Sequence, residues 1–211
     1  MHKTKMKSVL LLALALAAPV SPAQEVEPNA LLQSVTLEVI AAMKQERDLH
    51  GGNLKQSASL VEMKVLPLID FPHMTRIAVA RNWRLASPDQ QTALTAAFRT
   101  LLVHTYSSVL SSYRDQVIEF RGVRPVPGDT EVTVKSVVKQ SGTAPIAMDY
   151  DMEKTPAGWK IYDIKVAGVS LVTTYRDTFS ERIRDDGVDG LIKALEDKNR
   201  QGDSRSIAPK T

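Results

Sequence analysis

The sequence predicts an α+β fold, with helices at both ends of one domain and a sheet of four strands between them. Apolar residues recur every three or four positions up to about residue 113 and again from residue 171, which is typical of helices. Between residues 117 and 166 apolar and polar residues alternate instead, which is typical of strands with one solvated face. No internal repeat or long linker interrupts this order, so we expect a single domain.

The first 23 residues have the features of an export signal. Three lysines precede an unbroken run of ten apolar residues at positions 9–18. That run is too short for a membrane span, which needs about 20 apolar residues. Small residues before position 24 predict cleavage after Ala23. We therefore expect a signal peptide at 1–23, one domain at 24–200 and a frayed polar tail at 201–211.

Charge and cysteine content disfavour several classes of function. The expected signal holds three of the 27 basic residues and none of the 24 acidic ones, so the remaining chain has no net charge. Nucleic-acid binding driven by attraction to phosphate is therefore disfavoured. The chain has no cysteine, which excludes disulfides, thiolate metal sites and a cysteine nucleophile.

The first half of the domain is expected to be helical. Stripes of apolar residues predict helices over 29–47 and 54–68, the second disturbed at its end by Pro67. The run Asp70-Phe71-Pro72 is typical of a helix start, because proline is tolerated in the first turn. This short helix is expected to end near Trp83.

The next helix begins with a strong helix-start signal, Ser87-Pro88-Asp89-Gln90. Serine is a good N-cap, proline fits the first helical position, and glutamine at the third can close a capping box. Up to about Tyr113 the apolar residues cover an arc of roughly 200°. An ordinary surface helix needs a stripe of only about 100°. This helix should therefore be covered on two sides, or face both a core and a cavity.

Four strands are expected at 117–123, 131–140, 144–155 and 159–166, separated by turn residues. The alternation is clearest in the third, where Ile146, Met148, Tyr150 and Met152 point one way. Short connections favour antiparallel pairing, with one apolar and one solvated face. After the sheet, two helical stripes are separated by Asp186-Gly187.

Catalytic and metal-binding motifs give little signal. His50, His73 and His104 lack the spacing of metal ligands, and neither a nucleophile elbow nor a phosphate-binding glycine loop is present. Asp163 lies among apolar residues, where we expect a structural role and an arginine is a candidate partner. We therefore expect no metal and no cofactor, and we assign no catalytic residue. Because catalytic triads can assemble from scattered residues, the lack of motifs makes an enzyme less expected without excluding one.

Two blocks of sequence carry a family resemblance. The first runs from Asp70 through Trp83-Arg84 and Ser87 to Tyr106, and the second covers 158–179, beginning Gly158-Trp159-Lys160-Ile161-Tyr162-Asp163. Both resemble the MlaC family, the periplasmic phospholipid-binding, toluene-tolerance proteins of Gram-negative bacteria. One departure is Val79-Ala80, where the family usually has Leu-Gly. We expect this change to be tolerated inside a helix.

The resemblance implies a fold and a task. The fold is a twisted, mainly antiparallel four-stranded sheet wrapped by helices into a cone with an apolar cavity, like nuclear transport factor. The task is to carry phospholipid through the periplasm between an outer-membrane lipoprotein–porin complex and an inner-membrane ABC transporter with an MCE-domain subunit, which maintains outer-membrane lipid asymmetry. Two alternatives stay open: a small-molecule enzyme on the same cone, starting from Asp163 or Tyr162, and a periplasmic chaperone or carrier of lipoproteins.

A carrier of diacyl lipid needs a deep apolar pocket. At about 0.8 kcal/mol per methylene, exposing roughly thirty methylenes to water costs about 25 kcal/mol. The candidate lining residues are Trp83, Phe98, Leu102, Tyr106, Val109, Ile146, Met148, Tyr150, Ile164, Val166, Val169, Tyr175 and Phe179. The sequence does not separate residues that line a pocket from residues that fill a core.

A phospholipid headgroup is charged and costly to bury, so it should stay in water at the mouth of the pocket. Arg81, Arg99 and Arg176 are candidates to lie near it. For Arg176 we expect a structural salt bridge first, with Asp163 as a candidate partner, and contact with a headgroup second.

Overall fold

The computed structural model describes residues 26–50, 59, 62–111, 116–122, 126 and 128–201, with the side chains of 46–50 and 107–111 outside that description. The predicted signal peptide therefore lies outside the described residues, as do Tyr113, most of 54–61 and the tail beyond 201. None of the helices in the described ranges is both long and apolar enough to cross a bilayer.

Four helices, three short 3₁₀ helices and five strands make up the described fold. The helices are α1 (Pro28–His50), α3 (Phe71–Val79), α4 (Pro88–Ser111) and α5 (Arg176–Gln201). The strands are β1 (Val117–Arg121), β2 (Glu131–Lys139), β3 (Ile146–Thr155), β4 (Gly158–Val166) and β5 (Val169–Ser170). The 3₁₀ helices are η1 (Leu66–Leu68), η2 (Ala80–Leu85) and η3 (Thr173–Tyr175).

The strands form one sheet in the order β1-β2-β3-β4-β5, and each pairs antiparallel with the next. The predicted α+β class and antiparallel sheet are confirmed, but the sheet has five strands where the sequence predicted four. The fifth strand has only two residues, too few to show an alternating pattern. It is joined to β4 by Ala167-Gly168, whose φ angles of 51° and 83° make a tight hairpin turn.

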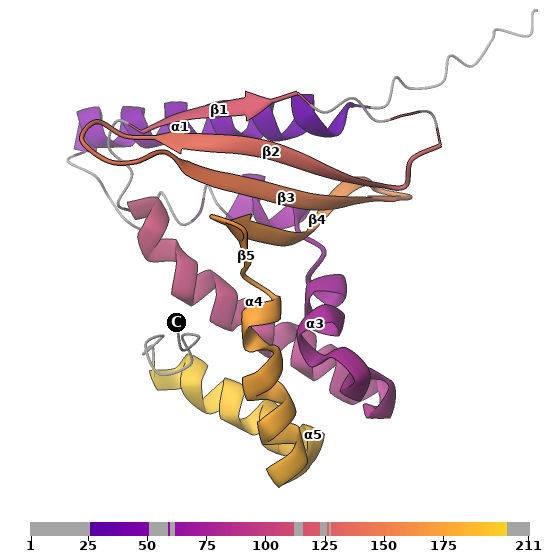
Figure 1. Cartoon of the computed structure of the whole chain (residues 1–211). Helices are drawn as coiled ribbons and strands as arrows, with labels where there is room; N and C mark the ends of the chain where they lie inside the picture. The colour runs from indigo at the N-terminus through magenta and orange to yellow at the C-terminus, as the bar shows by residue number, and fades with distance from the viewer. Residues whose placement is uncertain are drawn as a thin grey trace, which may run out of the picture.

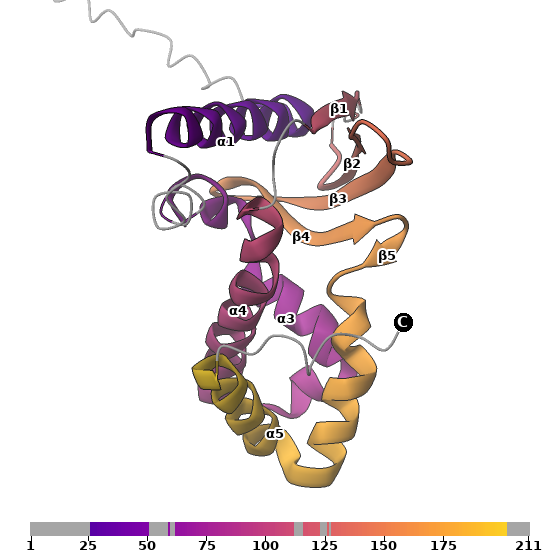
Figure 2. The same cartoon turned by 90° about the vertical axis from the view of Figure 1, so that its left-hand side faces the viewer.

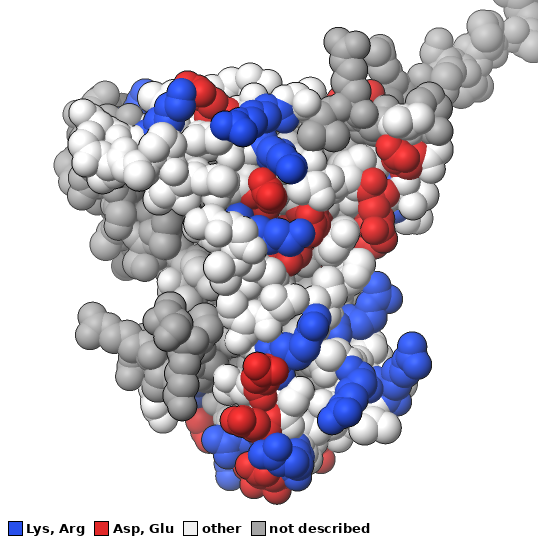
Figure 3. All heavy atoms as spheres, viewed as in Figure 1, with Lys and Arg blue, Asp and Glu red and all other residues white. Residues whose placement is uncertain are grey.

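The two faces of the sheet differ in character. Cross-strand partners place Val134, Tyr150 and Ile164 together on one face, and Lys135, Asp149 and Lys165 on the other. Charged side chains gather over the face turned to the viewer in Figure 3, and α1 crosses the opposite side of the sheet in Figures 1 and 2. The sheet is therefore solvated on one face and covered on the other, as the alternation predicted.

A bulge in β4 decides which side chains share the apolar face. Met152 pairs with Ile161 and Asp151 with Asp163, so Tyr162 is an extra residue with no partner in β3. Ile161 and Ile164, three positions apart, consequently lie on the same face.

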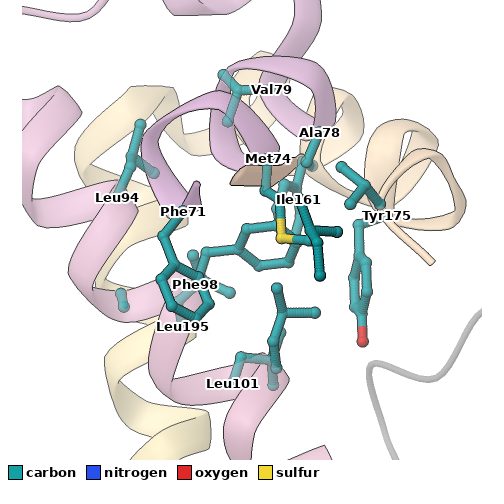
Figure 4. Packing of buried hydrophobic residues seen from close by; sticks show 14 of the residues in the cluster. Phe71, Met74, Ala78, Val79, Leu94, Phe98, Leu101, Ile161, Tyr175 and Leu195 are labelled. Carbon is teal, nitrogen blue, oxygen red and sulfur yellow. The ribbon is translucent and has the colours of Figure 1, made fainter. Parts of the chain in front are cut away.

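Helices α3, α4 and α5 form a helical lobe beside the β5 edge of the sheet (Figures 1 and 2). Their apolar stripes meet in a tightly packed core, where Phe98 and Leu94 have no exposed surface. Figure 4 shows that side chains from α3, α4, α5 and β4 converge there. One side of the wide apolar arc predicted for α4 is thus occupied by this core.

Both predicted helix starts are confirmed by capping hydrogen bonds. The Asp70 carboxylate accepts from the amide of His73 at 2.8 Å, at the start of α3. At the start of α4, the Gln90 amide donates to Ser87 Oγ at 3.2 Å, and the Ser87 amide donates to Gln90 Oε1 at 2.9 Å. This reciprocal pair is a capping box. The predicted break at Gly187 is also confirmed, since its φ of 73° kinks α5.

The expectation that Ala80 would sit harmlessly inside a helix is wrong. Helix α3 ends at Val79, and Ala80 is its C-cap residue with φ 53° and ψ −129°. An L-residue with a Cβ rarely adopts this conformation, whereas glycine adopts it freely. Replacing the glycine that the family usually has therefore introduces local backbone strain.

Candidate functional site

The apolar face of the sheet is the main candidate for a binding surface. We call the apolar sheet face the set Ile118, Phe120, Val132, Val134, Val138, Ile146, Met148, Tyr150, Met152, Ile161, Ile164 and Val166, which the strand register places on one side. Of these, Val134, Met152 and Ile161 are buried in the core, and the others keep some exposed surface. A fully packed core would not leave so many apolar side chains partly exposed.

Tyr150 lies near the middle of the apolar sheet face. Its ring stacks on Phe120 with 6.3 Å between centroids, and its hydroxyl donates to Met148 Sδ at 3.9 Å. Burial raises the pKa of Tyr150, and a hydrogen bond with Ser136 partly offsets this. This part of the sheet face is therefore apolar, and its polar groups are the uncharged hydroxyls of Tyr150 and Ser136 and the polarisable thioether of Met148. Such a surface suits a flexible hydrocarbon chain.

Four predicted lining residues lie in the packed core of the helical lobe. Phe98 contacts Tyr175 and Phe179 edge-on, each at 5.2 Å between ring centroids. The exposed fractions of Phe98, Tyr175 and Phe179 are at most 1%, and that of Leu102 is 8%. These side chains are surrounded by protein, so the structure does not group them with the partly exposed sheet residues.

The other predicted lining residues lie at three places. Met148, Tyr150, Ile164 and Val166 are half-buried on the apolar sheet face, and Ile146 and Val169 are exposed near its ends. Tyr106 and Trp83 are half-buried at the border of the core. A hydrogen bond links Tyr106 to Tyr175, and burial raises the pKa of Tyr106 well above its usual range. The side chain of Val109 lies outside the described residues.

The three predicted headgroup arginines have different surroundings. The Arg176 guanidinium donates to the backbone carbonyl of Ile77, from Nη2 at 3.3 Å and from Nε at 3.4 Å. The Arg99 guanidinium lies over the Phe71 ring, 5.5 Å from its centroid. Arg81 is exposed on η2.

Among the residues that the structure describes, Asp163 has no arginine partner, although the sequence suggested one. The Asp163 Oδ1 atom accepts from the amides of Ile164 at 2.8 Å and Val172 at 3.4 Å, and its carboxylate also bonds Ser170. These bonds satisfy the buried carboxylate without a cation. Burial nevertheless raises the pKa of Asp163. Its role is to fasten the turn around β5 and η3 to strand β4.

Tyr162 and Asp163, the two residues considered for catalysis, make stacking and hydrogen-bond contacts with neighbouring residues. Tyr162 stacks on His73 at 4.4 Å between ring centroids, and His73 Nδ1 lies 2.5 Å from the Glu153 carboxylate. Burial and nearby carboxylates raise the pKa of Tyr162 to about 12, so this phenol stays protonated near neutral pH. Over the part of the chain that the structure describes, no three acidic, histidine or cysteine side chains are placed to hold a metal ion.

Comparison with known proteins identifies the family. The profile of the MlaC protein family matches residues 33–197, most of the chain. The chain belongs to the MlaC family. The family resemblance predicted from the two sequence blocks is thereby confirmed.

Three named proteins are similar to this chain over most of its length. A phospholipid-binding protein from Ralstonia solanacearum, solved in complex with a phospholipid, is 38% identical; the match has a TM-score of 0.74 and covers 84% of this chain and 99% of that one. The toluene tolerance protein ttg2D of Pseudomonas putida is 23% identical, over 85% of this chain and 83% of that protein. The intermembrane phospholipid transport system binding protein MlaC of Haemophilus influenzae is 19% identical, over 84% of each.

Part of the apolar sheet face was not predicted from the sequence. Ile118, Phe120, Val132 and Val138 share it with the predicted residues, but were not among the candidates. The alternation in 117–123 placed Ile118 and Phe120 on one side of a strand, which was the available signal. The sequence does not contain the strand register, which places Phe120 opposite Ser136 and Ser136 opposite Met148.

Proposed function

We propose that this MlaC-family protein is a non-enzymatic carrier of phospholipid, with the acyl chains held against the apolar sheet face. The observation that carries this proposal is a sheet face whose apolar side chains stay partly exposed beside a fully packed helical core. It is supported by the relative, 38% identical, whose solved structure contains a phospholipid.

The wall that we propose for the acyl chains is formed by Phe120, Met148, Tyr150, Ile164 and Val166. These five half-buried side chains come from strands β1, β3 and β4 and lie on one face of the sheet. A hydrocarbon chain laid on them removes apolar surface from water on both partners, at about 25 cal/mol per Å². We propose that Ile146 and Val169 lie at its ends, and that Phe98, Leu102, Tyr175 and Phe179 support the pocket from the packed side. Tyr106, Trp83 and Val109 remain predicted lining residues.

The headgroup is proposed to remain in water at the mouth. A carrier that binds the acyl chains on an apolar wall would accept several headgroups, because few polar groups face the ligand. Arg99 and Arg176 are each engaged by other groups, with Phe71 and with the carbonyl of Ile77. Any contact they make with phosphate would therefore be secondary to a structural role.

We further propose the compartment and the partners. The basic and apolar start of the chain supports export to the periplasm, with removal of residues 1–23. In that compartment the carrier would exchange lipid with an outer-membrane lipoprotein–porin complex and with an inner-membrane ABC transporter bearing an MCE-domain subunit. Maintenance of outer-membrane lipid asymmetry would follow from that exchange.

A matched pair of substitutions on β3 tests the proposed wall. Met148→Asp places a carboxylate on the apolar sheet face, and Ala147→Asp places the same group on the solvated face one residue earlier. Because an unpaired charge against hydrocarbon costs several kcal/mol, Met148→Asp should reduce bound lipid at least about tenfold. Ala147→Asp should leave the lipid content unchanged. Lipid is measured by native mass spectrometry, and folding by circular dichroism.

Equal lipid content in folded samples of the two variants would contradict the proposed wall. If Met148→Asp does not fold, the milder Ile164→Ser is used, with the exposed Val117→Ser as its control.

A further inference from the structure

A second candidate site lies on the helical lobe, away from the sheet. A hollow of about 560 Å³ opens between η2 and the first half of α5. The residues that line it include Arg81, Asn82 and Leu85 from η2, and Asp177, Glu181 and Arg184 from α5. We call this feature the lobe hollow. It is distinct from the apolar sheet face, whose residues come from β1 to β4.

Acidic and basic side chains line the lobe hollow without forming ion pairs with one another. The side chains of Arg81, Asp177 and Glu181 are exposed, and none has an ion pair or hydrogen bond to any other residue that the structure describes. Asp177 and Glu181 are four residues apart on α5, so they project from the same side of the helix. Arg184 is partly engaged, by Asp185 at 3.1 Å.

This arrangement of charge selects the chemistry of a ligand. A guanidinium binds phosphate through two parallel hydrogen bonds, and carboxylates accept hydrogen bonds from a primary ammonium. A purely anionic ligand would meet the two carboxylates, and a purely cationic ligand would meet Arg81. A group with both charges, such as phosphoethanolamine, satisfies both sides of the hollow.

The rim of the lobe hollow indicates where such a group would come from. Leu85, one of the residues that line the hollow, is 75% exposed, and the basic Arg81 and Arg84 lie in the same 3₁₀ helix. Exposed apolar side chains beside basic residues are typical of surfaces that rest on a bilayer interface. No acidic residue occurs between Phe71 and Pro88, so η2 would meet a lipid surface without repulsion from its own segment.

We propose that the lobe hollow binds the phosphoethanolamine headgroup of a bilayer lipid and docks the helical lobe on the membrane surface. In this arrangement Arg81, which the sequence placed near a headgroup, contacts a lipid of the bilayer instead of the transported lipid. The proposal does not depend on a filled pocket, because the two sites share no residue.

Flotation with three kinds of vesicle tests this docking. The vesicles contain phosphatidylcholine alone, or equal parts of phosphatidylcholine and either phosphatidylethanolamine or phosphatidylglycerol. Because exposed ionic contacts are individually weak, binding to the ethanolamine vesicles should exceed binding to the other two by about threefold or more. Soluble O-phosphoethanolamine at high concentration should release the protein, whereas phosphocholine should not.

Charge-neutral variants assign the effect to the lobe hollow. Asp177→Asn with Glu181→Gln should abolish the preference for ethanolamine vesicles, and Arg81→Gln should weaken binding to all three kinds. Glu27→Gln with Glu196→Gln removes two exposed carboxylates elsewhere and should change nothing. Bound lipid is measured on the same samples, so failure of the carrier proposal would be seen separately.

Three results would overturn the docking proposal. The first is equal binding of the wild-type protein to ethanolamine and choline vesicles. The second is a preference that survives in Asp177→Asn with Glu181→Gln. The third is strongest binding to phosphatidylglycerol vesicles, which would indicate attraction by the arginines alone.

Discussion

Arg176, the first residue of α5, donates two hydrogen bonds to the carbonyl of Ile77 in the last turn of α3. The carbonyls at a helix C-terminus lack partners within the helix and carry partial negative charge, so a guanidinium there is favourable. This contact ties the beginning of the C-terminal helix to the end of α3. It gives Arg176 a structural role, although its predicted partner was a carboxylate.

Replacing Arg176 should therefore lower stability modestly. Because the side chain is exposed, we expect Arg176→Ala to reduce the free energy of unfolding by about 0.5–1 kcal/mol. Arg176→Lys should restore part of the loss, since it keeps the charge. Urea denaturation followed by circular dichroism measures both. Unchanged stability together with loss of bound lipid would instead assign Arg176 to the headgroup.

Ala80→Gly should stabilise the protein. The φ of 53° and ψ of −129° at Ala80 cost an L-residue of order 1 kcal/mol or more, and glycine adopts them without strain. Ala78→Gly is the control, because Ala78 is fully buried within helix α3. There glycine should destabilise by about 1 kcal/mol. Thermal unfolding should therefore shift in opposite directions, and a shared decrease would refute the strain at Ala80.

Asp163 should make stability depend on pH. Its pKa is raised in the folded protein, from 3.8, so folding favours the protonated carboxyl and ionisation reduces stability. An asparagine side chain at this position would keep an oxygen acceptor for the two amides but stay neutral. The stability of Asp163→Asn relative to wild type should therefore rise as the pH is raised above about 4. Urea titrations across this range measure it; a relative stability that falls with pH would contradict burial as the dominant cause.

The Ser87 capping box should contribute to the stability of α4. Ser87→Ala removes the hydroxyl that accepts from the Gln90 amide, and typically costs about 1 kcal/mol. Thr92→Ala is a suitable control, because its exposed hydroxyl bonds a carbonyl within the helix. Chemical denaturation should show a clearly larger loss for Ser87→Ala. Equal losses would mean that the cap is not important in solution.

Local features of the fold could be predicted from the sequence, and long-range ones could not. The helix starts at Asp70 and Ser87, and the break at Gly187, depend on residues within one turn, so their signals lie in adjacent positions. The bulge at Tyr162 depends on pairing with β3. Strict alternation would have placed Ile161 and Ile164 on opposite faces, whereas the bulge puts them on the same one.

The candidate site was predictable only in part for the same reason. Alternation in β3 correctly grouped Met148 with Tyr150 on one side of a strand. It did not distinguish Tyr150, which keeps exposed surface, from Phe98, which has none. Both are aromatic residues in apolar stripes, and the difference arises from which elements close around them. The resemblance to a family supplied the expectation of a lipid, which spacing alone did not.

The central claim is that the apolar sheet face holds a phospholipid, and the lipid content of the purified protein tests it most directly. Native mass spectrometry is applied to protein purified without detergent, followed by extraction and analysis of any bound lipid. The account predicts protein carrying about one diacyl phospholipid with mixed headgroups. Protein that remains free of lipid after incubation with phospholipid vesicles would contradict the account, and the sheet face would then require another ligand.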